Sequence, residues 1–201
     1  MFIEPHIRKS NAKTGWIEVI CGSMFSGKTE ELIRRIKRAR IANQKVELFK
    51  PAVDIRYDTE KIVSHDENAI LSKPVVNSRD IYETGVESEV VGIDEAQFFD
   101  MDLPLICERL ANEGVRVIIA GLDMDYLGKP FGPMPQLLSL AEYVTKVHAI
   151  CQCCGNIAVF SYRKSTMTKQ VLLGEKDVYE PRCRTCFLQG MEEKSPDKGI
   201  L

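Results

Sequence analysis

The chain has 201 residues, 44% of them hydrophobic, with 27 Lys and Arg against 29 Asp and Glu and a formal net charge of -2. This composition is too apolar for a disordered protein, and its charge balance supplies no bulk positive field for nucleic acid. No run approaches the ~20 apolar residues of a membrane helix, and the first residues do not form a secretory signal. We therefore expect a cytoplasmic protein with neither a nucleic-acid nor a membrane partner.

The chain divides into four parts by composition and hydrophobic pattern. Residues 1–14 are expected to be a loose N-terminal extension, and residues 15–149 alternate short apolar runs with longer amphipathic ones. Strands with little polar alternation suit a parallel sheet covered on both faces, so we predict an α/β domain over 15–149. Residues 150–190 are Cys-rich, and 191–201 are expected to be a flexible tail. In chain order, the predicted elements are strand 16–21, helix 29–42, strands 46–49 and 89–93, helix 103–110, strand 115–120, helix 137–141 and strand 143–150.

A phosphate-binding loop follows the first predicted strand. Residues 22–29 fit the pattern G-x-x-x-x-G-K-[ST], and a predicted helix begins where the loop ends. In such a loop, backbone N–H groups and the helix N-terminus bind phosphate oxygens. We expect Lys28 to reach the β- and γ-phosphates of ATP and the Thr29 hydroxyl to ligate Mg²⁺. The residues predicted to bind ATP in this loop are Gly22, Ser23, Met24, Phe25, Ser26, Gly27, Lys28 and Thr29.

Two carboxylates follow another buried strand. Asp94 and Glu95 come directly after the apolar run at 90–93, at the strand end where doubly wound sheets place their ligands. Asp94 is predicted to orient the Mg²⁺, and Glu95 to deprotonate the group that attacks the γ-phosphate. These residues predict Mg²⁺–nucleotide chemistry without identifying the acceptor.

The last quarter of the chain carries two C-x-x-C pairs. Cys151 and Cys154 form the first, and Cys183 and Cys186 the second. Because thiols stay reduced in the cytoplasm, we predict a structural Cys₄ Zn²⁺ site, with redox chemistry as the alternative. The segment between the pairs is longer than in the usual zinc ribbon, so a substantial loop projects from the metal site. Cys153 is expected to be a bystander.

Taken together, these motifs resemble the zinc-containing cytosolic-type (type II) thymidine kinase family, over residues 16–187. The resembling segments are Gly22–Thr29, Lys50-Pro-Ala-Val-Asp54-Ile-Arg56-Tyr57, Ser64-His65, Asp94–Phe99, Gly121-Leu-Asp, Lys129-Pro-Phe-Gly132 and the four paired cysteines.

The resemblance implies roles for individual residues. Glu95 matches the general base that takes the proton from the 5′-hydroxyl of thymidine. Arg56 matches a residue near the transferring phosphate, and Asp94 and Gln97 match further positions of the ATP site. The positions that match the thymine pocket are Met24, Phe98, Leu122, Tyr126, Phe131 and Tyr179.

The resemblance also implies an architecture. The fold would be a RecA-like P-loop domain with a mostly parallel sheet and a small C-terminal zinc-bearing domain. A lasso-like loop in that domain would act as a lid over the nucleoside. Members of the family are usually homotetramers inhibited by thymidine triphosphate. The implied reaction is transfer of the γ-phosphate of ATP to thymidine, or to deoxyuridine, in nucleoside salvage and DNA precursor synthesis.

Other interpretations stay open on the residues alone. A RecA-like zinc-ribbon ATPase acting on nucleic acid would share the loop, the Asp-Glu pair and the cysteines, and there Glu95 would activate water. A nucleotide-binding regulatory module without turnover is a third class. Each pocket aromatic could simply be a core residue, and His65 is assigned no catalysis. A basic helix surface, expected to face solvent or another subunit, comprises Arg34, Arg35, Lys37, Arg38 and Arg40.

Overall fold

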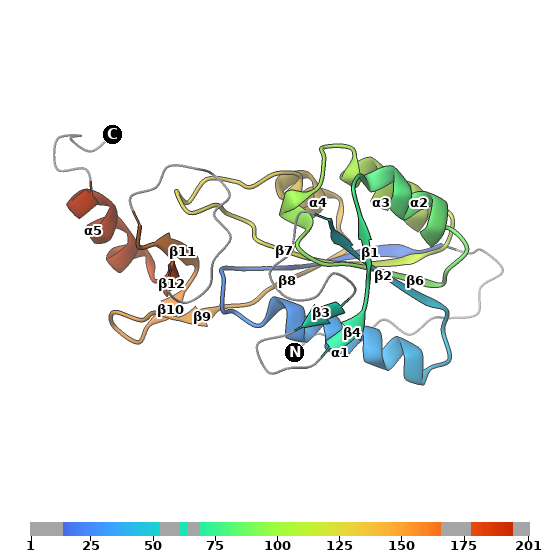
Figure 1. Ribbon diagram of the computed structural model, residues 1–201, viewed down its shortest axis with the longest axis horizontal. Coiled ribbons are helices and arrows are strands. Elements are labelled where there is room, and N and C mark those ends of the chain that lie inside the picture. Colours follow the sequence, from blue (N-terminus) through green and yellow to red (C-terminus); the bar gives the residue numbers. More distant parts are fainter. Residues whose placement is uncertain (1–13, 53–60, 64–68, 166–177, 195–201) are drawn as a thin grey trace.

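A computed structural model describes residues 14–52, 61–63, 69–165 and 178–194. Arg56 and the Ser64-His65 pair, singled out in the sequence, lie outside the described residues, as does most of the expected N-terminal extension. The central element is a sheet between two helical layers (Figure 1).

The sheet has six strands, and every neighbouring pair is parallel. This arrangement confirms the predicted α/β class and explains why the central strands are apolar on both faces. Their order across the sheet is β5 (Lys73–Val75), β2 (Val46–Pro51), β6 (Val90–Ile93), β7 (Arg116–Gly121), β1 (Trp16–Cys21) and β8 (Tyr143–Lys146).

The helices cover opposite faces of this sheet. Helix α1 (Lys28–Ile41) buries its apolar stripe on one face. Helices α2 (Ser78–Gly85), α3 (Leu103–Asn112) and α4 (Met134–Leu140) pack on the other. The two hydrophobic cores therefore lie above and below the strands and hold the strand ends in fixed positions.

Helix α2 was not predicted from the sequence. Its N-cap is Asn77, whose side chain accepts a hydrogen bond from the Asp80 N–H, and both the N–H and the hydroxyl of Ser78 donate to Asp100. An Asx residue before a short amphipathic run is a helix-start signal. The signal was present at Asn77, but the helix that it starts has only eight residues.

The predicted strand 143–150 is two strands. Strand β8 ends at Lys146, and β9 (Ala149–Ile150) leaves the main sheet to pair antiparallel with β10 (Ile157–Ala158). The last contact with the main sheet is the hydrogen bond that the Val147 N–H donates to the Cys21 carbonyl, at the end of β1. A continuous apolar pattern cannot show that its two halves pair with different partners.

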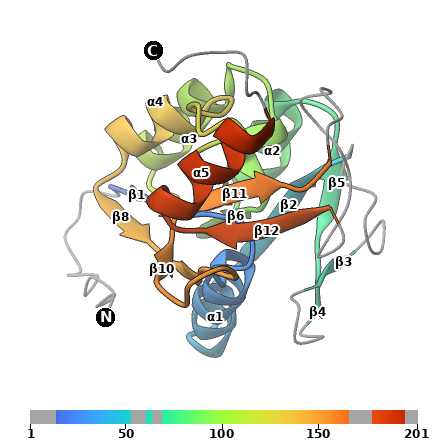
Figure 2. The same cartoon turned by 90° about the vertical axis from the view of Figure 1, so that its left-hand side faces the viewer.

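A smaller unit follows at the carboxyl ends of the parallel strands. It contains β9, β10, β11 (Phe160–Arg163), β12 (Tyr179–Arg182) and α5 (Arg184–Lys194), which we call the C-terminal region. Strands β11 and β12 pair antiparallel. Figure 2 shows α5 and these strands in front of the sheet. Helix α5 extends to Lys194, so the first residues of the range expected to be a flexible tail are helical. A separate hairpin consists of β3 (Lys61–Val63) and β4 (Ala69–Leu71).

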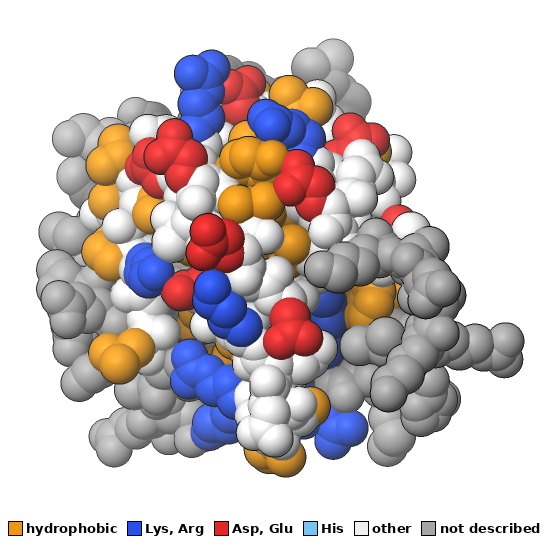
Figure 3. Space-filling view, turned by 90° about the vertical axis from the view of Figure 1, so that its right-hand side faces the viewer, with side chains coloured by type: hydrophobic (Ala, Val, Ile, Leu, Met, Phe, Trp, Pro, Cys, Tyr) orange, Lys and Arg blue, Asp and Glu red, His pale blue; other side chains and the backbone are white. Residues whose placement is uncertain are grey.

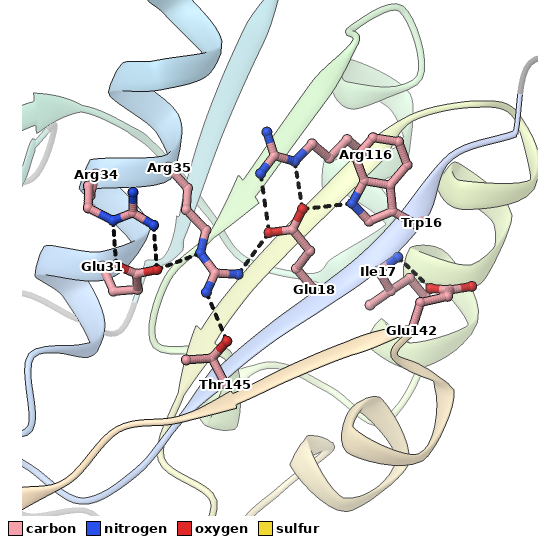
Figure 4. A network of polar contacts seen from close by, with 9 residues as sticks. All are labelled: Trp16, Ile17, Glu18, Glu31, Arg34, Arg35, Arg116, Glu142 and Thr145. Carbon is pink, nitrogen blue, oxygen red and sulfur yellow. Dashed lines mark hydrogen bonds and ion pairs between the residues drawn. The ribbon is translucent and has the colours of Figure 1, made fainter. Parts of the chain in front are cut away.

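One residue of the basic helix surface does not face solvent. Arg35 and Glu18 are both fully buried, and the Arg35 guanidinium donates to Glu18 at 2.8 Å and to the Thr145 hydroxyl at 2.9 Å (Figure 4). Arg116 and the Trp16 indole also donate to the Glu18 carboxylate. The expectation that Arg35 is solvated was therefore wrong, because Glu18 on β1 requires a buried partner.

The far end of the molecule is mixed in charge. Basic, acidic and apolar side chains all lie on the face shown in Figure 3, which is turned away from the C-terminal region. Within the described part of the chain, no helix is long and apolar enough to cross a bilayer.

Candidate functional site

The predicted phosphate-binding loop connects the end of β1 to the start of α1. Gly22 has φ 146°, and a Cβ there would lie 2.2 Å from the carbonyl oxygen of Val147. Only glycine satisfies both conditions. Phe25 adopts a left-handed φ of 63°, which is uncommon for a residue with a side chain. The loop is thus a specific, partly strained backbone conformation rather than an ordinary strand-to-helix turn.

The loop brings the predicted Mg²⁺ residues together. The Thr29 hydroxyl, at the start of α1, donates to Oδ2 of Asp94 at 3.3 Å, although 65 positions separate them. A hydroxyl and a carboxylate are oxygen ligands of the kind that Mg²⁺ prefers. Lys28 Nζ donates to the Ser23 carbonyl at 2.8 Å, so its charge stays within the loop. These positions fit the chemistry expected for a Mg²⁺–nucleotide.

Glu95 sits at a sharp change of direction after β6. Its backbone is left-handed, with φ 51° and ψ 41°, and it caps the short helix η1 (Ala96–Phe98). Its N–H donates to Oδ1 of Asp94 at 2.9 Å. A left-handed conformation costs a non-glycine residue about 1–2 kcal/mol. Such strain is concentrated at functional sites, where the surrounding structure maintains it. The Glu95 N–H and the Thr29 hydroxyl thus bind the two oxygens of the same Asp94 carboxylate.

Gln97 has partners that its sequence position did not indicate. The side chain is 2% exposed. Its amide nitrogen donates to Oε2 of Glu95 at 2.5 Å, and its amide oxygen accepts from the Leu122 N–H at 2.9 Å. Gln97 therefore links the acid after β6 to the backbone after β7.

Two of the predicted pocket residues form an aromatic pair. Phe98 and Phe131 meet edge to face, with ring centroids 5.7 Å apart. Phe98 is half-buried, whereas Phe131 is buried, so the pair also packs part of the core. This geometry satisfies the aromatic preference for T-shaped contacts and is that of a core pair, and the pocket role of the two rings stays a prediction.

A buried arginine joins the two predicted pocket tyrosines. The Arg163 guanidinium lies 3.6 Å from the ring centroid of Tyr126 and donates two hydrogen bonds, of 3.0 and 2.6 Å, to the Tyr179 hydroxyl. Arg163 is 1% exposed. It stacks on one ring and orients the other by hydrogen bonds, which a lysine's single ammonium would not reproduce. Sequence reasoning missed Arg163, because nothing local distinguishes it from a surface arginine.

The phosphate-binding loop also touches the C-terminal region directly. The Met24 N–H donates to the Ser161 hydroxyl on β11 at 3.0 Å. Phe25 packs against a small cluster that contains Cys151, Cys183 and Cys186. Ser161 is a second residue that the sequence did not single out, since a serine within a short strand carries no motif.

The four paired cysteines converge. The Sγ atoms of Cys151, Cys154, Cys183 and Cys186 all lie within 4.8 Å of one another, close enough to hold a metal ion. Tetrahedral Zn²⁺–thiolate bonds of about 2.3 Å require sulfurs about 3.8 Å apart, and Cys154 and Cys183 are 3.6 Å apart. Cys153 is exposed and is not in this group.

The thiols of this group are electrostatically linked. Burial of the Cys151 thiol opposes its ionisation, but backbone N–H groups of Cys183, Cys153 and Cys154 outweigh burial and lower its pKa to about 6. The pKa of Cys186 is raised instead, first by its hydrogen bond with Cys183. The Cys151 thiolate thus forms readily whereas ionisation of Cys186 is opposed, and a bound cation would favour the Cys186 thiolate.

The two isolated cysteines behave differently. Burial raises the pKa of Cys21 to about 11, and burial also raises that of Cys107. Both thiols are buried in the sheet core. They are therefore packing residues, and at Cys21 burial outweighs the opposing charges of Lys146 and Lys28.

Comparison with known proteins places this geometry in a family. A family model described as thymidine kinase matches residues 15–187. The thymidine kinase of Bacteroides thetaiotaomicron is 59% identical over 96% of this chain and 96% of its own length. That of Rhodothermus sp. is 58% identical over 93% and 88%, and that of Porphyromonas gingivalis 59% over 87% and 86%. The solved flagellar accessory protein FlaH from Methanocaldococcus jannaschii, at 14% identity over 72% of this chain and 76% of its own, gives a TM-score of 0.47, too low to establish a shared fold.

Proposed function

The chain belongs to the thymidine kinase family, and we propose that it transfers the γ-phosphate of ATP to the 5′-hydroxyl of thymidine, giving dTMP and ADP. The observation that carries this proposal is the contact between Thr29 and Asp94 with Glu95 immediately beside it. A phosphate loop after β1, with a metal-orienting acid and a separate base after β6, supplies the parts that phosphoryl transfer requires.

In the proposed reaction, each residue has one task. Backbone N–H groups of Gly22–Thr29 and the Lys28 ammonium hold the ATP phosphates. Mg²⁺, bound by Thr29 and, through water, by Asp94, would neutralise phosphate charge. Glu95 accepts the proton of the 5′-hydroxyl as that oxygen bonds to the γ-phosphorus, and the bond from that phosphorus to the bridging oxygen of ADP breaks.

The Arg56 guanidinium is proposed to balance charge on the transferring group, by family resemblance. It lies outside the described residues. Its contribution therefore rests on the Asp-x-Arg-Tyr segment of the sequence alone.

The nucleoside base is proposed to bind where the C-terminal region meets the segments that follow β6 and β7. The Tyr126–Arg163–Tyr179 stack and the Phe98–Phe131 pair supply apolar and aromatic faces for a pyrimidine. Leu122 and Met24 complete the proposed pocket. The four-cysteine cluster is proposed to bind structural Zn²⁺ and to anchor this region as a lid, which excludes water from the transferring phosphate.

Family membership supports four further proposals. We propose a homotetramer in the cytoplasm, with thymidine triphosphate as feedback inhibitor and deoxyuridine as a second acceptor. We also propose that residues 15–149 and 150–190 act as nucleotide and lid domains, respectively. The near-full-length similarity to the thymidine kinase of Bacteroides thetaiotaomicron supports these proposals.

One assay separates kinase from ATPase. The protein is incubated with γ-labelled ATP, Mg²⁺ and a panel of nucleosides, with and without single-stranded DNA. Label on thymidine, more than on cytidine or purine nucleosides, supports the kinase. DNA-stimulated phosphate release without a labelled nucleotide would instead support the zinc-ribbon ATPase and overturn the proposal.

A further inference from the structure

The Gln97 side chain connects the ends of two parallel strands. Its amide nitrogen is 2.5 Å from Oε2 of Glu95, and its amide oxygen is 2.9 Å from the Leu122 nitrogen. Gln97 itself is 2% exposed, so its amide has little contact with water. Both ends of the amide are therefore occupied by the chain itself, one of them by the proposed general base.

The partners decide which way the amide points. The Leu122 N–H can only donate, so it must face the amide oxygen of Gln97. The amide NH₂ must then face Glu95, whose ionised carboxylate can only accept. The flipped amide would oppose donor to donor and oxygen to oxygen. The Gln97 amide thus donates to one oxygen of Glu95, and the Leu122 N–H after β7 determines this orientation of the amide.

Two glycines make room for this arrangement. A Cβ on Gly121 would lie 3.0 Å from the Gln97 amide oxygen and 2.7 Å from the sulfur of Met134. A Cβ on Gly132 would lie 2.4 Å from the Gln97 carbonyl oxygen. The backbone therefore closes around Gln97 on two sides. Both polar ends of the side chain are thus bound by the chain itself, and its 2% exposure leaves little surface for a nucleotide.

We propose that Gln97 is a positioning residue that fixes the Glu95 carboxylate toward the nucleoside hydroxyl, rather than a ligand of ATP. This inference rests on the proposed function of Glu95 as general base. Glu95 stands on a left-handed turn, and the buried Gln97 amide donates to one oxygen of its carboxylate. Holding one oxygen leaves the carboxylate in a single orientation, which is the precondition for efficient proton transfer.

The test is a double-mutant cycle in the full-length, metal-loaded protein. Gln97→Met is made in the wild-type and in the Glu95→Gln background, and kcat and KM are measured for thymidine and ATP. In the wild-type background, kcat should fall about tenfold or more, as for losing a hydrogen bond to a charged group, with both KM values within about twofold. In the Glu95→Gln background, the same change should lower kcat by less than about twofold, because the residue it acts through is gone.

Two further variants control for folding. Gln136→Met makes the same change at an exposed position of α4 and should leave all constants unchanged. Gln97→Glu keeps an acceptor for Leu122 but replaces the donor facing Glu95, so it should also lower kcat, even if Gln97→Met folds poorly. A crystal structure of either Gln97 variant should show the Glu95 carboxylate displaced or in several conformers.

Three results would overturn the inference. An equal loss of kcat in both backgrounds would mean that Gln97 acts independently of Glu95. A raised KM for ATP at unchanged kcat would make it an ATP ligand, and an undisturbed Glu95 in the variant structure would exclude positioning. If the wild-type protein phosphorylates no nucleoside, the proposed function itself fails and the inference fails with it, an outcome that the wild-type assay alone identifies.

Discussion

The backbone N–H of Met24 donates a 3.0 Å hydrogen bond to the Ser161 hydroxyl, which lies 137 positions further along the chain. The bond joins the phosphate-binding loop to strand β11 of the C-terminal region. Phe25, the next residue of the loop, packs against the buried cluster of Ala149, Cys151 and Ala158. The proposed phosphate site and the proposed metal site are therefore in contact, and a mutation in one should have a measurable effect on the other.

Removing the Ser161 hydroxyl should weaken ATP binding. Ser161→Ala takes away the acceptor of the Met24 N–H, and losing one hydrogen bond of about 0.5–1.5 kcal/mol corresponds to roughly a two- to tenfold higher Kd. Isothermal titration with a non-hydrolysable ATP analogue gives this Kd. Ser161→Thr keeps the hydroxyl and should restore wild-type binding. Equal Kd values for all three proteins would show that the loop does not depend on this bond.

Replacing the proposed base should abolish turnover but not nucleotide binding. We expect Glu95→Gln to lower kcat for thymidine phosphorylation at least ~10²-fold, because the glutamine amide cannot accept the proton. The Kd for ATP should stay within about twofold, since the phosphate loop is untouched. Glu108→Gln, at an exposed position of α3, is the matched control. Unchanged turnover in Glu95→Gln would remove Glu95 from this role.

Metal content should follow the four-cysteine group and not its exposed neighbour. Elemental analysis of the purified protein should find about one zinc per chain, as for a Cys₄ structural site. Cys154→Ser should lose the zinc and lower the unfolding temperature, because the binding free energy of a structural metal is also folding free energy. Cys153→Ser should change neither quantity. A wild-type protein that is folded and active without metal would contradict the assignment.

Two adjacent arginines should differ in their contribution to stability. Arg35→Met leaves the buried Glu18 carboxylate without one of its cationic partners and should lower the free energy of unfolding by about 3 kcal/mol. Arg34 pairs with Glu31 on the surface, where its side chain is 46% exposed, so Arg34→Met should cost less than about 1 kcal/mol. Urea unfolding followed by circular dichroism measures both. Similar losses would mean that burial of the Glu18–Arg35 pair does not matter.

The contiguous motifs could be predicted from sequence because their chemistry depends on spacing along the chain. The residues of the phosphate loop are held by one turn, and each C-x-x-C pair is aimed by one short loop. Their flanking apolar runs also predicted the parallel sheet, since buried strands have little polar alternation. The structure added that Thr29 contacts Asp94 and that the two cysteine pairs meet.

The roles of Arg35, Gln97 and Arg163 could not be predicted in the same way. Each is a polar side chain whose role depends on a partner from another element. Arg35 binds Glu18 on β1, Gln97 binds the backbone after β7, and Arg163 stacks on Tyr126 in the loop after β7. In the sequence, Arg35 is one of several basic residues on α1, and its charge does not reveal the buried Glu18 that binds it.

The composition and the local spacing of the chain thus determined the class of chemistry: nucleotide phosphates, a carboxylate base and a cysteine metal site. These properties follow from which groups are present within a few residues of one another. Only the tertiary structure decided which polar groups are buried together, because burial and hydrogen-bond direction depend on the packing of strands and helices that are distant in the chain. That packing placed Gln97 against Glu95 and joined Met24 to Ser161.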